Sequence, residues 1–494
     1  MLWIYPKNAV TAGSAVHFTP MSEKAVIIGA GIAGLAAALR LRAQGFEVTV
    51  LERRPLLGGK LHCVEQDGYR FDAGPSFLTQ PERLDALFAL FGEENSLRIE
   101  PVDPSVEYWW EDGTRCSTPR DRDALVAQLT ALGASEAKVR AYLDAIAKAY
   151  DELAVPFVDS DIQQPRFWFS PAHISRMGGS IGQLGKTFET YNRSWFPDAP
   201  KLVQLLCRYA TYAGNDPYQA PAFMTSIADV ELRQGIWYPE DGLRSVPEAL
   251  IALGRRHGVV YETGCEVTGL RRTGRRVEAV EVNGEAMDAD VFISAIDPQH
   301  VAPWLDRKLS KVPRALSAMI WFWGVDAVDD IRLHNIFFSD DYRQEFGQLK
   351  AGTPGDDPTI YINSSSTRSP GHAPAGKQNW FVMINAPADH GQDWPVLQAR
   401  LRPVVKAKLE RVLGRSITVH TEATYCPPDI ARTSGAWKGS IYGPSGNTLL
   451  DLFRKQPPTD PKLSNLFYCG GSSHPGGGIP MCLASARLAV EHIR

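Results

Sequence analysis

The 494-residue sequence has few cysteines, little excess charge and no long apolar run. Its seven cysteines include no CxxC pair, which argues against a disulfide framework or a structural zinc site and favours a reducing cytoplasm. Lys plus Arg total 52 against 56 Asp plus Glu, so the basic excess typical of nucleic-acid-binding proteins is missing. The nearest approach to a membrane span, residues 25–39, is shorter than the roughly 18–20 apolar residues that a spanning helix needs. We therefore expect no metal site, no nucleic-acid partner and no transmembrane helix.

The strongest motif lies near the N-terminus, where residues 24–52 read KAVIIGAGIAGLAAALRLRAQGFEVTVLE. This pattern predicts a strand at 25–28, a GxGxxG turn at Gly29, Gly31 and Gly34, a helix at 32–44, and a strand at 46–51 that ends at Glu52. Gly29 permits the tight turn, Gly31 lets the backbone approach a pyrophosphate, and Gly34 allows close packing of helix on strand. The helix N-terminus offers N–H groups to phosphates, and Glu52 can accept both ribose hydroxyls. The segment predicts a dinucleotide site but does not separate NAD from FAD; a glycine-rich helix start in another α/β domain is the simpler alternative.

A second candidate half-site lies at the C-terminus, where residues 465–494 read NLFYCGGSSHPGGGIPMCLASARLAVEHIR. A short strand leads into the glycine turn Gly470-Gly471, and Pro480 suits the first position of a following helix. The N-terminus of that helix would suit the electron-rich edge of a reduced flavin. The alternative is a C-terminal helix that only caps its domain. Two half-sites so far apart predict a discontinuous nucleotide-binding domain with a long insertion.

Further segments after the first motif establish a family resemblance. RRPLLGGK at 53–60 and DGYRFDAGP at 67–75, taken with the motif, resemble the flavin amine oxidase and carotenoid desaturase superfamily. In that superfamily the GGK turn lies along the flavin, and a backbone group at the position of Val267 contacts the adenine. The resemblance implies FAD as cofactor, held by Gly29, Ala30, Gly31, Gly34, Glu52, Arg53, Gly59, Lys60, Gly74, Pro75, Val267, Gly470, Gly471, Pro480 and Met481.

The C-terminal segment narrows the resemblance. SSHPGGGIPMCLASA is similar to the signature of phytoene-desaturase-type bacterial carotenoid desaturases. HNIFFS at 334–339 and NWFVMIN at 379–385 resemble the subgroup that acts on hydroxylated or end-modified carotenoids at the 3,4 position. The general resemblance covers nearly all of residues 22–494.

The fold that this resemblance implies is an α/β fold with a Rossmann-like FAD-binding domain of amine-oxidase type. The domain is discontinuous, and a mixed α+β substrate domain is inserted into it. An Asn283-Gly284 pair inside an alternating stretch predicts a hairpin within the FAD-binding part. We expect the FAD-binding domain at 22–75, 241–300 and 430–494, the substrate and membrane-contact domain at 76–240 and 301–429, and a disordered tail or an upstream-start artefact at 1–21.

The implied activity is desaturation of C–C single bonds in a carotenoid by hydride transfer to flavin, on a phytoene-like substrate or at the 3,4 position of a hydroxycarotenoid. Two other enzymatic functions remain as alternatives, a carotenoid end-group oxidase and an amine oxidase. A third alternative is not an enzyme: a lipid-binding protein similar to the prenyl-protein escort proteins, which share the fold but bind no flavin. Product mass separates desaturation from oxygenation, and a colourless purified protein would favour the lipid carrier.

A polyene has no ionisable group, so the protein is expected to supply position and an apolar tunnel. The candidate polar groups are His474, Asp198 and Lys201. His474 is beside the flavin turn, so we expect its ring to border the tunnel and to orient the reacting end of the substrate rather than to act as an obligatory base. The cluster Phe167-Trp168-Phe169 is a candidate contact with a membrane surface, or else a loop packed on the protein. No second GxGxxG is available for NADPH, so oxygen or a membrane quinone is the expected electron acceptor. The expected location is the cytoplasm, at the inner face of the cell membrane.

Overall fold

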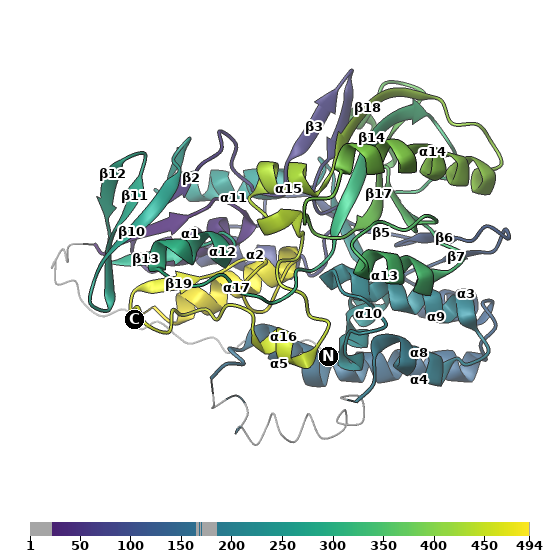
Figure 1. Ribbon diagram of the computed structural model, residues 1–494, viewed down its shortest axis with the longest axis horizontal. Helices are drawn as coiled ribbons and strands as arrows, with labels where there is room; N and C mark the ends of the chain where they lie inside the picture. The colour runs from purple at the N-terminus through teal and green to yellow at the C-terminus, as the bar shows by residue number, and fades with distance from the viewer. Residues whose placement is uncertain (1–21, 165–166, 168, 170–184, 494) are drawn as a thin grey trace.

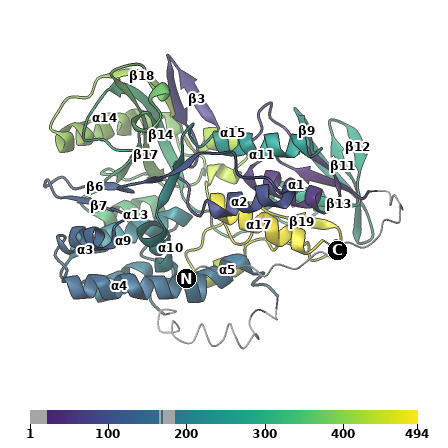
Figure 2. The ribbon, with the colours of Figure 1, turned by 180° about the vertical axis from the view of Figure 1, so that it is seen from behind.

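The computed structural model describes residues 22–164, 167, 169 and 185–493. Two sheets dominate it, and they lie on opposite sides of the molecule in both Figure 1 and Figure 2. The predicted tail at residues 1–21 falls outside the described residues, so it stays an expectation.

The first sheet is a five-stranded, wholly parallel sheet. Its order is β19 (Leu466–Tyr468), β13 (Val291–Ser294), β1 (Lys24–Ile28), β2 (Glu47–Glu52), β9 (Val260–Thr263). Nearly every residue of these strands from β19 to β2 is buried, as expected for a parallel sheet that is covered on both faces.

Alternate residues of the central strand face two different cores. Ala25 and Ile27 join the core formed with helices α1 (Ile32–Ala43), α11 (Ser245–Arg256) and α17 (Ile479–Glu491). Val26 and Ile28 join the core formed with the antiparallel meander of β10 (Val267–Thr273), β11 (Arg276–Val282) and β12 (Glu285–Asp288). Helices therefore cover one face of the parallel sheet and a small second sheet covers the other.

The second large sheet has seven strands in the order β18 (Val419–Tyr425), β14 (Ser317–Asp326), β17 (Lys377–Ala386), β16 (Ile360–Asn363), β15 (His334–Phe337), β6 (Glu107–Trp109), β7 (Arg115–Ser117). It is mixed, because β15 pairs with β6 in parallel while the other neighbours are antiparallel. On one face, Trp321, Trp323 and Trp380 form a core with the long helix α14 (Trp394–Leu413). The opposite face carries Phe322 and Phe381 toward the middle of the molecule.

A block of helices lies beneath the second sheet in both ribbon views. It contains α3 (Arg122–Thr130), α4 (Glu136–Ala149), α8 (Phe188–Trp195), α9 (Pro200–Cys207), α10 (Ile227–Asp229) and α13 (Tyr342–Lys350). Helix α5 (Val155–Asp159) follows α4 along the chain and lies against α17. The remaining elements are β3 (Cys63–Gln66), β4 (Tyr69–Asp72), α2 (Glu82–Phe88), β5 (Ile99–Val102), β8 (Ile236–Pro239), α12 (Pro298–Val301), α15 (Pro427–Ser434) and α16 (Leu449–Phe453).

The predicted fold class is confirmed: a parallel sheet of the nucleotide-binding type is combined with a mixed α+β part. All five strands of the parallel sheet fall within the predicted FAD-binding segments, and all seven strands of the mixed sheet fall within the predicted substrate segments. The precise domain boundaries remain a prediction.

Candidate functional site

A cavity of about 570 Å³ runs between the two sheets. Both predicted half-sites border it, since its wall includes the glycine turn before α1 and the glycine turn before α17. Of the fifteen predicted cofactor residues, those that line it are Gly29, Gly31, Glu52, Arg53, Gly59, Lys60, Gly74, Pro75, Val267, Gly470, Gly471, Pro480 and Met481. Ala30 and Gly34 do not line the cavity, and their roles are to support the residues that do.

The glycines of the first motif have separable roles. A Cβ added to Gly34 would lie 2.0 Å from the Gly29 carbonyl oxygen, so α1 can approach the first strand only with glycine there. A Cβ added to Gly31 would meet no atom within 4 Å, and Gly31 lies on the cavity wall. Gly34 therefore serves packing, whereas Gly31 keeps space open in front of the helix N-terminus.

The Glu52 carboxylate is fixed in place by backbone groups. It is 8% exposed, and it accepts hydrogen bonds from the N–H groups of Ala30 and Arg54, both at 3.0 Å. Ala30 thus orients the acid from behind the wall. Glu52 remains part of the cavity lining, in a position to accept hydrogen bonds from a ribose.

Two helix N-termini point their unsatisfied N–H groups toward the same cavity. Neither Gly31, the N-cap of α1, nor Gly478, the N-cap of α17, supplies a side-chain cap. Gly478 has φ +106°, a conformation that glycine adopts without strain. Helices of 12 and 13 residues that leave their positive ends open in this way favour anionic or electron-rich groups.

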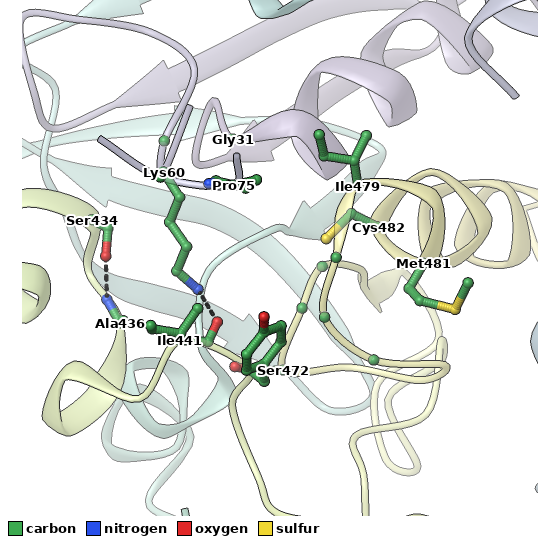
Figure 3. Close-up of a pocket in the computed structure, with 18 of the residues that line it drawn as sticks. Gly31, Lys60, Pro75, Ser434, Ala436, Ile441, Ser472, Ile479, Met481 and Cys482 are labelled. Atoms are coloured by element: carbon green, nitrogen blue, oxygen red, sulfur yellow. Dashed lines mark hydrogen bonds between the residues drawn. The ribbon is translucent and has the colours of Figure 1, made fainter. Parts of the chain in front are cut away.

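Lys60 supplies one of the cationic side chains that line the cavity (Figure 3). Its Nζ donates a hydrogen bond to the Ile441 carbonyl oxygen at 2.6 Å, near Ser472 in the close-up. Burial lowers the pKa of Lys60, so its charge is held by a backbone dipole in a weakly hydrated place. The open helix ends, the fixed Glu52 carboxylate and the half-buried Lys60 together match the pyrophosphate, ribose and ring of a flavin dinucleotide.

Beyond these groups, the cavity wall is formed by the second sheet and the helical block. Phe381, Met383 and Asn385 alternate along β17 and all line the cavity. Phe157 and Phe223 face them from the helical side. An apolar wall of this kind suits a hydrophobic molecule placed beside the nucleotide-binding end.

A buried polar cluster adjoins this wall. Arg208 Nη2 lies 3.0 Å from Glu231 Oε2, with 6% and 0% of the two side chains exposed. Tyr108, Tyr209 and Tyr212 donate their hydroxyls to the Glu231 carboxylate. Arg208 and Tyr212 line the cavity, and Glu231 lies behind them. The sequence does not predict this cluster. Arg208, Tyr209 and Tyr212 are close along the chain, but the Glu231 carboxylate that joins them comes from a separate helical segment, residues 230–234.

The three predicted catalytic residues are not on the cavity wall. Asp198 is exposed at the surface. Lys201 forms an ion pair with Asp112 and a hydrogen bond with Thr114. The structure brings neither of them near the other predicted site residues, so catalytic roles for them have no geometric support.

His474 is next to the flavin turn in sequence, but its ring points elsewhere. The ring is 1% exposed, packs edge-on against Phe157 at 5.1 Å between centroids, and has Nε2 2.9 Å from the Ser160 carbonyl oxygen. We expected the ring to border the substrate tunnel, and the structure instead uses it to join the C-terminal turn to residues 157–160. Burial lowers the pKa of His474 to about 4.

This buried histidine predicts a loss of stability in acid. Between its folded pKa of about 4 and the ~6.5 of an unfolded histidine, the unfolded state binds the proton and the folded state does not. Folding stability contributed by His474 is therefore present above pH ~6.5 and falls on acidification, by about 2 kcal/mol at pH 5. We expect His474→Gln, which keeps a donor for Ser160, to lose less stability than wild type between pH 7.5 and pH 5 in chemical denaturation. Equal losses in the two proteins would refute this.

The predicted membrane-contact cluster is only partly described. Trp168 lies outside the described residues, Phe167 is buried at 7% exposure, and Phe169 is 78% exposed. Phe167 is therefore not available to a membrane surface in this structure. Across the described ranges, no helix combines the length and apolar character needed to cross a bilayer.

Comparisons with known proteins show the family of this chain. A family model described as flavin containing amine oxidoreductase matches residues 32–494. The 1-hydroxycarotenoid 3,4-desaturase of Flavobacterium sp. (strain P99-3) is 34% identical over 485 residues, which cover 95% of this chain and 99% of that protein. The 4,4'-diapolycopene oxygenase of Methylomonas sp is 30% identical over 500 residues, which cover 96% of this chain and 98% of that protein.

A solved structure shows that the fold is shared as well. An oxidoreductase from Methanosarcina mazei superimposes with a TM-score of 0.64 over 95% of this chain and 100% of that one, at 16% identity, which shows a shared fold. The family model covers well over half of the chain, and the resemblance expected from the sequence is confirmed. The chain belongs to the flavin-containing amine oxidoreductase family.

Proposed function

We propose that this protein is an FAD-dependent carotenoid desaturase. The observation that carries the proposal is one continuous cavity that joins two open helix N-termini to an apolar sheet face. The family is flavin-containing, which favours an enzyme over a flavin-free lipid carrier. The similarity to a desaturase over almost the full length supports a carotenoid as substrate.

The residues of this chain account for binding and orientation. When bound, FAD supplies the two-electron acceptor for removal of hydrogen from a C–C single bond. Gly31 and Gly478 leave the helix ends open to it, Glu52 fits its ribose, and Lys60 adds a positive charge beside them. The phenylalanines of the far wall exclude water and align an extended apolar chain beside the nucleotide-binding end.

The proposed reaction within this class is 3,4-desaturation of a hydroxycarotenoid, with a phytoene-like substrate as the alternative. The first support is the similarity to the Flavobacterium protein. The second is that the segments HNIFFS and NWFVMIN, which resemble the 3,4-desaturase subgroup, form β15 and β17 and contribute side chains to the cavity wall.

The test of this proposal is expression in cells that make acyclic carotenoids, with and without an added carotenoid hydratase. We expect new pigments with red-shifted absorbance and a mass lower by two hydrogen atoms for each step. Unchanged pigments in both strains, from a protein that carries FAD, would overturn the desaturase assignment.

A carotenoid end-group oxidase is the second candidate. It is favoured by the similarity to the Methylomonas oxygenase, which covers nearly the whole chain. The same pigment extracts decide between the two, because oxygenation adds mass and desaturation removes it.

The proposed location is the cytoplasmic face of the cell membrane, and the proposed electron acceptor is oxygen or a quinone.

Phe169 supports a membrane contact, since a phenylalanine exposed at 78% favours transfer into an apolar phase. We expect Phe169→Ser to reduce co-flotation with liposomes about tenfold, in line with burial of one phenylalanine. Leu309→Ser is the matched control, because Leu309 is also exposed, at 45%, on another part of the chain. Equal flotation of wild type and Phe169→Ser would exclude this anchor.

A further inference from the structure

Polar residues gather on one part of the otherwise apolar cavity wall. Tyr342 on α13, Thr359 just before β16 and Asn385 on β17 all line the cavity. Thr359 and Asn385 both contact Glu345, which is 2% exposed and lies one helical turn after Tyr342 on α13. Thr359 Oγ1 donates to Glu345 Oε2 at 2.7 Å, and Asn385 Nδ2 lies 3.3 Å from Glu345 Oε1.

Two groups of this cluster have hydrogen-bonding capacity to spare. The Tyr342 hydroxyl is buried and has no hydrogen-bond partner among the described residues. Burial raises the pKa of Tyr342 far above its usual value, so the hydroxyl keeps its proton and can donate. Because Glu345 takes the Asn385 amide nitrogen, the Asn385 carbonyl oxygen is left as an acceptor, and none of the described residues donates to it.

We propose that Tyr342 and Asn385 form a binding site for a hydroxyl group carried near one end of the polyene substrate. A hydroxyl both accepts and donates a hydrogen bond, so it can accept from Tyr342 and donate to Asn385. Glu345 acts through Asn385 and Thr359 and is a positioning residue. This inference rests on the proposed function and adds to it the substrate group that the cavity recognises.

Such a hydroxyl-binding site would determine which bond of the polyene lies at the reacting position, which an apolar cavity alone does not. A polyene of repeating units fits an apolar tunnel equally well after sliding by one unit, so apolar contacts alone do not choose the reacting bond. A single hydrogen-bonded anchor fixes the register of the whole chain. In a 1-hydroxycarotenoid the 3,4 bond is only a few bonds from the hydroxyl, so the anchor also positions that bond.

The test measures affinity and product for two carotenes that differ in one group, lycopene and its 1-hydroxy derivative. Dissociation constants come from quenching of tryptophan fluorescence in the FAD-loaded, anaerobically reduced protein, which cannot turn over. We expect wild type to prefer the hydroxylated carotene at least about tenfold, the effect of one or two neutral hydrogen bonds. Tyr342→Phe and Asn385→Leu should each lower this preference about three- to tenfold, with wild-type FAD content.

Tyr218→Phe is the matched control. Tyr218 packs against Phe346 on the same helix, with 6.1 Å between ring centroids, but it does not line the cavity. It should keep the wild-type preference. The inference is overturned if wild type shows no preference, or if Tyr342→Phe and Asn385→Leu both keep it. Failure of the proposed function is seen separately, as absence of desaturated product from either carotene with oxidised wild-type protein.

Discussion

Replacing Gly31 with valine is expected to abolish FAD binding while the protein still folds. Gly31 has φ −72° and ψ 174°, which valine adopts without strain, and an added Cβ would touch no protein atom within 4 Å. The side chain would instead occupy cavity space in front of the α1 N-terminus, where the phosphates are expected. We expect at least a tenfold fall in the ratio of flavin to protein absorbance after purification, with apoprotein stability within about 0.5 kcal/mol of wild-type apoprotein.

Gly34→Ala is the contrasting variant for this experiment. Its Cβ would lie 2.0 Å from the Gly29 carbonyl oxygen, so the helix would have to move away from the strand. We expect the Gly34→Ala apoprotein itself to be destabilised, unlike Gly31→Val. Full flavin content in Gly31→Val would mean that the dinucleotide does not pass this helix end, and the assignment of the site would fail.

Replacing Glu231 with leucine is expected to cost about 3–5 kcal/mol of stability. The carboxylate is fully buried and balances Arg208, which would keep its charge in the protein interior without a carboxylate partner. The hydroxyls of Tyr209 and Tyr108 would also lose their acceptor, now 2.8 and 3.3 Å away. Denaturant unfolding of apoprotein measures the loss without a contribution from cofactor binding.

The double variant Arg208→Met/Glu231→Leu provides the control. Removing both charges removes the uncompensated cation, so the double variant should be more stable than Glu231→Leu alone. The single variant Arg208→Met completes the cycle. If the stability losses of Arg208→Met and Glu231→Leu add up to the loss of the double variant, the two residues are not coupled, and the description of the cluster as a compensated buried ion pair would be incorrect.

The parts of the fold that sequence reasoning located well are those with strong local signals. The strand, helix and strand around Gly29 begin and end within a residue or so of their expected positions. The Asn283-Gly284 signal marks a turn between β11 and β12, where both residues have positive φ. Local turn chemistry fixes such elements, and their sequence is sufficient to predict them. For the distant segments, the two half-sites predicted only that the nucleotide-binding domain is discontinuous, and its Rossmann-like form came from the family resemblance.

The substrate end of the site was beyond sequence reasoning for a physical reason. Tyr342 lies on a helix, Thr359 just before β16 and Asn385 on β17, and only the folded chain brings all three to one cavity wall, with Thr359 and Asn385 hydrogen-bonded to Glu345. His474 shows the converse, because closeness along the chain suggested a place at the cavity. Successive side chains of a turn point in different directions, and this ring turns toward Ser160.

The most direct test of the account is anaerobic mixing of the FAD-loaded protein with 1-hydroxylycopene. We predict that the flavin absorbance bleaches in a single turnover, and that the recovered carotenoid has lost two hydrogen atoms and gained one conjugated double bond. Flavin that stays oxidised while the carotenoid is shown to be bound would contradict the central claim that this cavity carries out FAD-dependent carotenoid desaturation.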